Sequence, residues 1–408
     1  MTTPDPRPYP YPTHPHPGSP YQAAPQYPVL PSPAPAQPIW SAPPPRARSG
    51  GVVFAIIGIV LGVVVGLLVL AYLVMALGVS TVATGAFLAL VPLAIVLLAI
   101  RWVDRWEPEP RWALWATFLW GAAVSVAIAL LVDLGVQVAT AFAVPGGSPD
   151  EALAAVVQAP LVEELAKGLG VLLVFAFSRA HFDGPVDGLV YAATVAAGFA
   201  FTENILYFGV SLAEGGAVEL GSVFVVRGLF SPFAHVLFTA CTGLMIGIGA
   251  RRGAGASIIL WFLGGLAGAV FLHALWNGSL TFAGDGAIAL YFLVQVPLFA
   301  GAILLTVFLR REESKLTRTR LGEYAAAGWL TPGEVDVLGT PAGRRRALAW
   351  ARVQRPSRVG EVRGLIADAT TLAFNRQMVV SGRGDVRRVQ DEGALLQRLS
   401  ARRSALLR

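Results

Sequence analysis

The sequence predicts an all-α protein, a polytopic membrane helix bundle with about eight transmembrane helices. Hydrophobic residues make up 55% of the 408 residues and charged residues only 14%, with a mean hydropathy of +0.62. A soluble domain carries about 25% charged residues. Apolar runs of near membrane-spanning length follow one another, and Lys and Arg fall in alternate loops between them, as expected for cytoplasmic loops.

The first segment, residues 1–49, holds 17 of the 29 prolines, interleaved with Tyr, Ala, Gln and Ser. Such a composition cannot build a packed core and predicts a disordered, polyproline-like tail. The segment also lacks the basic and then apolar start of a cleavable signal peptide. We therefore expect the first apolar span to be retained as an anchor.

Eight apolar runs follow the tail, each close to the length of about 20 residues that crosses a bilayer. They cover residues 52–77, 84–100, 112–132, 160–178, 186–209, 232–250, 256–280 and 288–309. Basic residues occur before the first run and after the second, fourth, sixth and eighth, whereas the alternate loops, around 79–83, 144–151, 210–221 and 281–287, contain no Lys or Arg. Both termini are therefore predicted to lie in the cytoplasm, with a membrane domain at residues 50–310.

Residues 311–408 are rich in Arg, with Leu and Ala at helical spacing, and predict a basic, mostly helical cytoplasmic region. The net charge of +6 comes from loops and this tail, so it indicates topology rather than nucleic acid. The basic C-terminal helices fit either contact with anionic lipid or a solvated helical surface. Cys241 is the only cysteine, which excludes disulfides within the chain and a cysteine metal site.

Ionisable residues inside four of the predicted spans are the main functional signal, because a charged group in hydrocarbon costs at least about 2.5–3.5 kcal/mol. They are Glu163, Glu164 and Lys167 in the fourth span, Glu203 in the fifth, His235 in the sixth and His273 in the seventh, where the polar but neutral Asn277 follows.

The positions of these residues along their spans predict a common depth. Pro160 and Pro232 suit the first turn of a helix, which places Glu163 and His235 about 4–5 Å inside the outer face. Glu203 and His273 lie at a similar depth before the ends of their own spans. The sequence therefore predicts one shared site, water-accessible and just below the outer membrane surface.

Helical spacing assigns faces within this set. Glu163 and Lys167 stand at i and i+4, in the favourable order for an ion pair. Glu164 lies about 100° around the helix from Glu163, so we expect one carboxylate to face the reactants and the other to pair with Lys167. His273 and Asn277 also share a stripe.

Two chemistries fit this set of side chains. Two His and one Glu match the ligands of hydrolytic zinc sites, with the second Glu as general base. Alternatively, a Glu and a His activate water directly, while His273 and Asn277 donate hydrogen bonds to the developing oxyanion.

Four motifs in order resemble the PrsW family of intramembrane proteases, which is related to the CAAX prenyl endopeptidases and to bacteriocin-processing membrane proteases. They are EELAK at 163–167, FAFTEN at 199–204, the segment around His235, and HALWN at 273–277. The similarity covers about residues 85–310.

The resemblance implies a hydrolase, a membrane metalloprotease that cuts a membrane protein such as a single-pass anti-sigma factor near the extracytoplasmic face and so begins regulated intramembrane proteolysis. It implies a catalytic set made of Glu163, Glu164, Lys167, Glu203, His235 and His273, and the oxyanion role considered above adds Asn277. A divalent metal, with Zn²⁺ as the expected ion, would be bound by Glu163, Glu203, His235 and His273. The composition, rich in Ala, Gly and Arg, suggests the plasma membrane of a bacterium with a GC-rich genome.

Two alternatives come from other functional classes. A proton- or cation-coupled transporter would use the same Glu and His residues as a relay, although no internal repeat is evident. A membrane anchor that presents the two tails to partners leaves the intramembrane charges unexplained.

Overall fold

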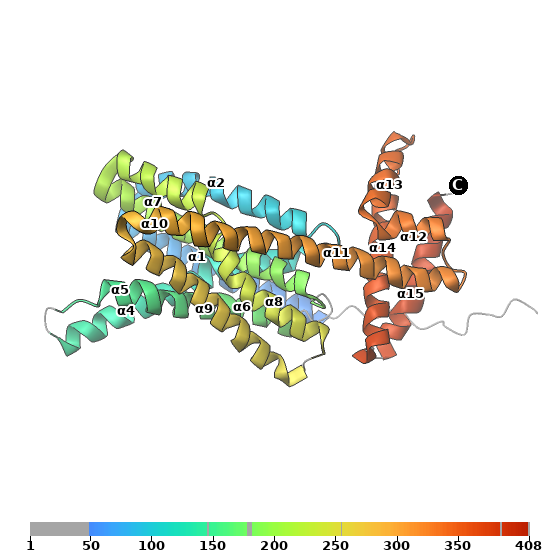
Figure 1. The fold of residues 1–408 in the computed structure, drawn as a ribbon, viewed down its shortest axis with the longest axis horizontal. Helices are drawn as coiled ribbons and strands as arrows, with labels where there is room; N and C mark the ends of the chain where they lie inside the picture. Colours follow the sequence, from blue (N-terminus) through green and yellow to red (C-terminus); the bar gives the residue numbers. More distant parts are fainter. Residues whose placement is uncertain (1–48, 145–146, 178–181, 254, 384–385, 407–408) are drawn as a thin grey trace, which may run out of the picture. The chain divides into compact units, whose positions relative to one another are not determined.

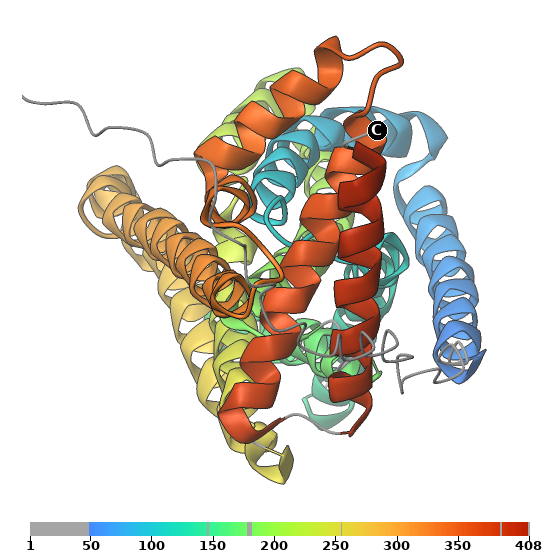
Figure 2. The same ribbon diagram turned by 90° about the vertical axis from the view of Figure 1, so that its right-hand side faces the viewer.

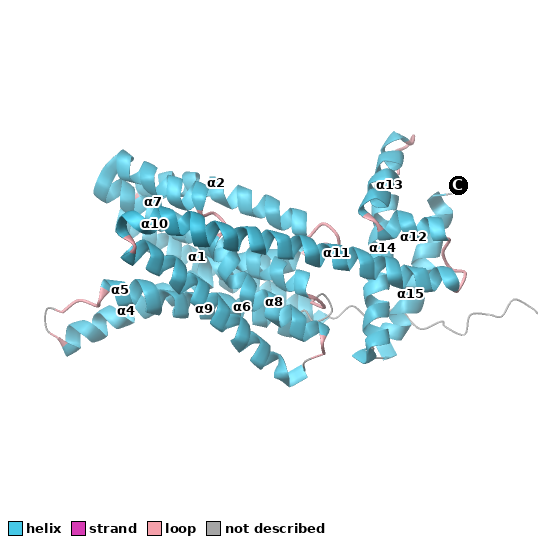
Figure 3. Cartoon of the chain, viewed as in Figure 1, coloured by secondary structure: helices cyan, strands magenta, loops and turns pink. Residues whose placement is uncertain are grey.

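The computed structural model describes residues 49–144, 147–177, 182–253, 255–383 and 386–406. Within these ranges the chain consists of helices joined by short loops, with no β-strand (Figure 1, Figure 3). This confirms the predicted all-α class. The Pro-rich tail at 1–48 lies outside the described residues.

All eight predicted apolar runs are found in helices. Their bounds are α1 Ser49–Leu77; α2 Val79–Val103; α3 Arg111–Leu119 with π-helical η1 Trp120–Ser125 and α4 Val126–Ala143; α5 Glu151–Leu153 with π-helical η2 Ala154–Gln158 and α6 Ala159–Phe177; α7 Pro185–Phe224 with π-helical η3 Val225–Phe230; α8 Ala234–Arg251; α9 Ile258–Phe282; and α10 Ala287–Leu290 with π-helical η6 Tyr291–Gln295 and α11 Val296–Ala326.

Six helical stretches among the described residues are long and apolar enough to cross a membrane. One of the six, Pro185–Arg251, contains both α7 and α8, which the sequence predicts as separate spans. Helix α6 is not among the six, and it carries Glu163, Glu164 and Lys167. The chain is thus a multi-pass membrane protein, while eight crossings and cytoplasmic termini remain predictions.

The helix that carries the EELAK motif begins earlier than predicted. Asp150 caps it by accepting a hydrogen bond from the Leu153 amide at 2.9 Å, and helical backbone then runs from Glu151 to Phe177. Pro160 is therefore not in the first turn; it follows the π-helical turn η2, whose wider backbone accommodates a residue without an N–H. Glu163 lies about 18 Å beyond the helix start, not 4–5 Å.

The segment between the fifth and sixth predicted spans also differs from the expected loop. Helical backbone continues past residue 209 because Leu, Ala and Glu there favour helix. Gly216, with φ of 68°, then breaks it, and the chain turns back. Phe224 from the returning stretch packs against Phe208, with 5.7 Å between ring centroids. Pro232 lies in the short turn before α8 rather than in its first helical turn.

Helix α7 is the central element of the membrane domain and packs against α2, α3, α6 and α8. Small residues allow the closest approach: a Cβ added to Gly188 would stand 2.0 Å from the carbonyl oxygen of Gly243 on α8. Close packing of this kind replaces the missing hydrophobic driving force between helices in lipid. It holds together α7 and α8, the helices that carry Glu203 and His235.

The C-terminal region is helical, as predicted, with α12 Pro332–Gly339, α13 Pro341–Val353, α14 Val359–Met378, π-helical η7 Val379–Arg383 and α15 Val386–Leu406. Helices α14 and α15 lie side by side (Figure 2). Leu321 of α11, Leu372 of α14 and Leu399 of α15 belong to one buried apolar cluster. The predicted boundary at residue 310 therefore falls inside α11, a continuous helix.

Candidate functional site

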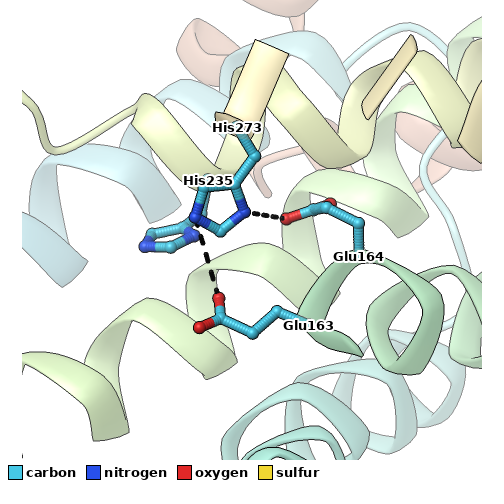
Figure 4. Close-up of side chains that lie close together, drawn as sticks. All are labelled: Glu163, Glu164, His235 and His273. Atoms are coloured by element: carbon cyan, nitrogen blue, oxygen red, sulfur yellow. Dashed lines mark hydrogen bonds and ion pairs between the residues drawn. The ribbon is translucent and has the colours of Figure 1, made fainter. Parts of the chain in front are cut away.

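Four side chains from three helices converge in the membrane domain. Glu163 and Glu164 come from α6, His235 from α8 and His273 from α9, and one ligand atom of each lies within 4.8 Å of the others (Figure 4). All four residues are buried. Among the described residues, they form the group of Asp, Glu, His and Cys side chains that is compact enough to hold a metal ion.

The four helices bring their polar residues to one level. Glu163, Glu203, His235 and His273 lie about 21–27 Å from the helix ends at Phe177, Pro185, Arg251 and Ile258, the ends predicted to be cytoplasmic. A common depth is thus present, as the sequence predicts. It is farther from the outer helix ends than expected, because α6 starts at Glu151 and α7 runs on past residue 209.

Lys167 lies among these acceptors with no solvent exposure. Its Nζ is 3.1 Å from Glu163 Oε2, 2.8 Å from Glu164 Oε1 and 3.1 Å from His235 Nδ1. The ammonium also stands 3.8 Å from the ring centroid of Phe199, a cation–π contact. The three donors of the ammonium are therefore all directed at partners.

Both carboxylates reach Lys167, which corrects the expectation that only one would. The long lysine side chain fits between the i−4 and i−3 positions, so it contacts Glu163 and Glu164 together. The two carboxylates still differ: the Glu163 side chain is 11% exposed and the Glu164 side chain 0%. Water that enters the site can reach Glu163 first.

Glu164 is held on several sides. Its Oε2 accepts a hydrogen bond from Thr239 Oγ1 at 2.8 Å, and its Oε1 lies 3.1 Å from His273 Nδ1. The ring of Phe238 stacks on the His273 imidazole at 4.7 Å between centroids. These contacts fix Glu164 and His273 in place, whereas the Nε2 of His273 faces Glu163 Oε2 at 3.9 Å.

Glu203 lies beside the cluster rather than in it. Its Oε2 is 2.8 Å from His235 Nε2, the ring nitrogen that faces away from Lys167, and it also pairs with Arg227. Glu203 is absent from the compact group of possible metal donors, which instead includes Glu164, a residue outside the predicted metal-binding set. Glu203 instead pairs with the Nε2 atom of His235, a candidate metal ligand. Carboxylates commonly hold the second nitrogen of a ligating histidine in metal sites.

Asn277 does not join the cluster. Its Nδ2 donates to the carbonyl oxygen of Ala155 in η2 at 2.8 Å and so links α9 to the start of the α6 helix. The i, i+4 spacing predicted that Asn277 shares a helix face with His273. Its short side chain nevertheless donates to the Ala155 carbonyl oxygen and not into the cluster. This contact gives no support to the predicted oxyanion role.

Like Thr239, Arg227 contacts an acidic residue of the site but was not predicted from the sequence. It contacts both Glu203 and Asn204. A signal was available, because Arg227 is the only Lys or Arg between Arg179 and Arg251 and stands in an apolar run.

Two carboxylates and two imidazoles fit a divalent ion such as Zn²⁺ in donor type, and their spacing is compact enough. One cation is already among them, since the Lys167 ammonium bonds three of the four residues. An ion at a bonding distance of about 2.0–2.2 Å from Glu164 Oε1 would stand within about 5 Å of Nζ. Metal binding there is therefore opposed by the charge of Lys167.

Comparisons with known proteins bear on the same region. Residues 109–302 match the model of the PrsW family of intramembrane metalloproteases. Protease PrsW of Clostridioides difficile is 35% identical over 159 residues, covering 39% of this chain and 63% of that protein. Protease PrsW of Bacillus subtilis is 34% identical over 111 residues, covering 27% and 47%.

The chain thus spans less than two thirds of the length of these relatives. No solved structure matches. The matched region includes every residue of the Glu/His cluster together with Lys167, Glu203 and Arg227. Residues 109–302 of this chain are therefore similar to the PrsW family and to the relatives named Protease PrsW.

Proposed function

We propose that this protein is an intramembrane endopeptidase that hydrolyses a peptide bond of another membrane protein near the extracytoplasmic face. The observation that carries the proposal is the convergence of Glu163, Glu164, His235 and His273 inside a multi-pass helix bundle. The family match and the relatives named Protease PrsW support it.

Glu163 is the water-activating base in this proposal, because it is the more exposed of the two carboxylates. It takes a proton from water as the water oxygen adds to the carbonyl carbon of the peptide bond. The proton then passes to the amide nitrogen as the C–N bond breaks, and a carboxylate and an amine are released.

The remaining residues orient Glu163 and stabilise the charge that develops during the reaction. Glu164 and Lys167 form the buried ion pair that positions Glu163, and His235 and His273 carry protons or donate hydrogen bonds to the oxyanion. A divalent metal, if bound, would be held by Glu163, Glu164, His235 and His273, and would supply a water of lowered pKa and a Lewis acid.

The substrate in this proposal is a single-pass membrane protein of the anti-sigma factor type, in the plasma membrane of a bacterium. The predicted cytoplasmic position of both termini supports a cut on the extracytoplasmic side, since the cluster is about 21–27 Å from the helix ends predicted to be cytoplasmic. The hydrocarbon core is about 30 Å thick, so the site lies in its outer half.

The rival function is a proton- or cation-coupled transporter that uses the same buried Glu and His residues. One experiment separates the two. Purified protein and its Glu163→Gln variant are each mixed with solubilised bacterial membranes, and newly formed protein ends are identified by mass spectrometry. We expect new ends within single-pass proteins with the unaltered chain alone. Identical sets of ends in both samples would reject the protease.

A further inference from the structure

Arg227 occupies a position that bilayers normally exclude for a charged side chain. It stands in the apolar stretch VFVVRGLF of α7 and η3, where an uncompensated guanidinium would be costly. Its side chain is only 23% exposed. A partly buried Arg in such a run needs a partner, and membrane charges that have one usually mark a functional site.

The backbone explains how Arg227 finds its partner. Gly216 turns the chain back on itself, and the returning stretch runs beside the part of α7 that precedes the turn. Arg227 thereby comes opposite Glu203 and Asn204, which lie more than twenty positions earlier in the sequence.

Arg227 makes three directed contacts. Its Nη2 pairs with Glu203 Oε2, its Nε donates to Asn204 Oδ1 at 2.9 Å, and its guanidinium lies 3.9 Å from the ring centroid of Tyr207. A planar guanidinium offers several donors in fixed directions and stacks on aromatic rings. It therefore fixes the Glu203 carboxylate in one orientation.

Glu203 in turn determines how His235 is presented to the cluster. Glu203 Oε2 accepts from His235 Nε2 at 2.8 Å, and the other nitrogen, Nδ1, faces Lys167 Nζ at 3.1 Å. A carboxylate on one imidazole nitrogen fixes the tautomer and leaves the lone pair on the other. The lone pair of Nδ1 therefore points into the Glu/His cluster.

We propose that Arg227 is a positioning residue of this site: it holds Glu203, which holds His235 with Nδ1 directed at the reacting groups. The inference rests on the proposed proteolytic function and extends it to a residue outside the predicted motifs. Arg227 itself contacts neither Glu163 nor Glu164 in the described structure; its effect passes through Glu203.

The test compares Arg227→Met and Arg227→Lys with a matched control, Arg310→Met. Arg310 also stacks its guanidinium on an aromatic ring, that of Trp102 at 4.1 Å, but it is outside the cluster. Cleavage is measured in liposomes on the membrane segment that the unaltered chain cuts fastest in the membrane mixture. We expect R227M to lower kcat about 10–100-fold with KM unchanged, which is the usual loss when a residue that hydrogen-bonds a metal ligand is replaced. R227K should recover most of the loss, and R310M should show none.

A double variant tests whether Arg227 acts through Glu203. Because both residues belong to one path, R227M/E203Q should be no slower than E203Q alone. It also leaves no unpaired carboxylate, so it can be measured even if R227M fails to accumulate. The inference would be overturned if the kcat losses of R227M and E203Q multiplied in the double variant, or if R227M left kcat unchanged. An inactive E163Q would still support the proteolytic function in either case. Equal activity of E163Q and the unaltered chain would instead reject the proteolytic function itself.

Discussion

The Lys167 ammonium stands 2.8 Å from the Glu164 carboxylate, and neither side chain is exposed to solvent. Removing one member of a buried ion pair leaves an uncompensated charge and destabilises a protein by about 3–5 kcal/mol. The loss of either partner should therefore affect folding as well as the arrangement of the site. Glu163, which is partly exposed, has no such double role.

Replacing the two neighbouring glutamates should therefore give different results. We expect Glu163→Gln to lower cleavage by about 10²–10⁴-fold, the usual contribution of a general base, with little change in the unfolding temperature. Glu164→Gln should lower both cleavage and the unfolding temperature, because it leaves Lys167 with a weaker partner. Thermal unfolding in detergent and cleavage of the same membrane segment check this. A larger loss of stability in E163Q than in E164Q would contradict the assignment.

Zinc binding should depend on Lys167. Replacing it by Met removes a positive charge within about 5 Å of any ion bound to the cluster and frees three donor atoms. The Zn²⁺ affinity of purified Lys167→Met should exceed that of the unaltered chain by about tenfold or more. Equilibrium dialysis with elemental analysis measures it, and His235→Ala/His273→Ala is the control that lacks two donors. Weaker zinc binding in K167M would mean that Lys167 orients the ligands rather than opposing the metal.

Stability should fall as the pH rises, because of carboxyl groups in the loop between α2 and α3. Burial, and next the nearby charge of Asp187, raise the pKa of Glu109 well above its usual value, while the hydrogen bond from Tyr191 lowers it. Burial likewise raises the pKa of Asp104 to about 6. A raised carboxyl pKa means that the folded state holds its proton more tightly, so this stabilisation is lost as pH rises through the folded pKa.

The unfolding temperature should accordingly be higher at pH 5 than at pH 8, and Glu109→Gln should reduce the difference, since Gln stays neutral throughout. Thermal unfolding across that range is the measurement. Glu361→Gln, at an exposed position of α14, is the control and should keep the full dependence. The same pH dependence in E109Q and the unaltered chain would exclude Glu109 as a source.

Arg344 of α13 should stabilise the folded position of the 104–110 loop. Its guanidinium lies 3.4 Å from the Trp106 ring centroid, its Nη1 donates to the Trp106 carbonyl oxygen at 2.9 Å, and its Nη2 donates to Thr370 Oγ1 at 2.6 Å. Arg344→Leu leaves buried acceptors unpaired, at about 1–3 kcal/mol each. Hydrogen exchange of the loop should rise at least tenfold.

The control for this change is Arg346→Leu, on the same helix. The Arg346 side chain is 65% exposed and pairs with Asp336 at 3.1 Å, so its loss should leave the loop unchanged. Equal exchange in R344L and R346L would show that the loop is held by other contacts.

Sequence patterns predicted the parts of this structure that depend on composition and on regular helical spacing. The apolar runs predicted helices that the described structure contains, and the i, i+4 spacing predicted the contact between Glu163 and Lys167. Ordered motifs pointed to the residues that form the Glu/His cluster. Their convergence was predicted from their similar positions along the membrane helices. The predicted positions were too close to the outer helix ends.

The parts that sequence did not predict depend on local termination and on long-range partners. Hydropathy does not show that Asp150 starts a helix nine residues before Pro160, or that Gly216 folds the chain back. Without that turn, Arg227 has no visible partner and resembles a loop residue. Asn277 shares a helix face with His273, but a shared helix face does not predict which hydrogen-bond acceptor the Asn277 amide contacts.

The contact between Gly188 and Gly243 limits how a substrate reaches the cluster. At this level the backbones of α7 and α8 touch, and even one added methyl group would collide with a carbonyl oxygen. A transmembrane segment cannot enter between helices that leave no room for a carbon atom. On the side of the cluster towards Pro185 and Arg251, a bilayer entrance for a substrate must therefore open along a different seam of the bundle.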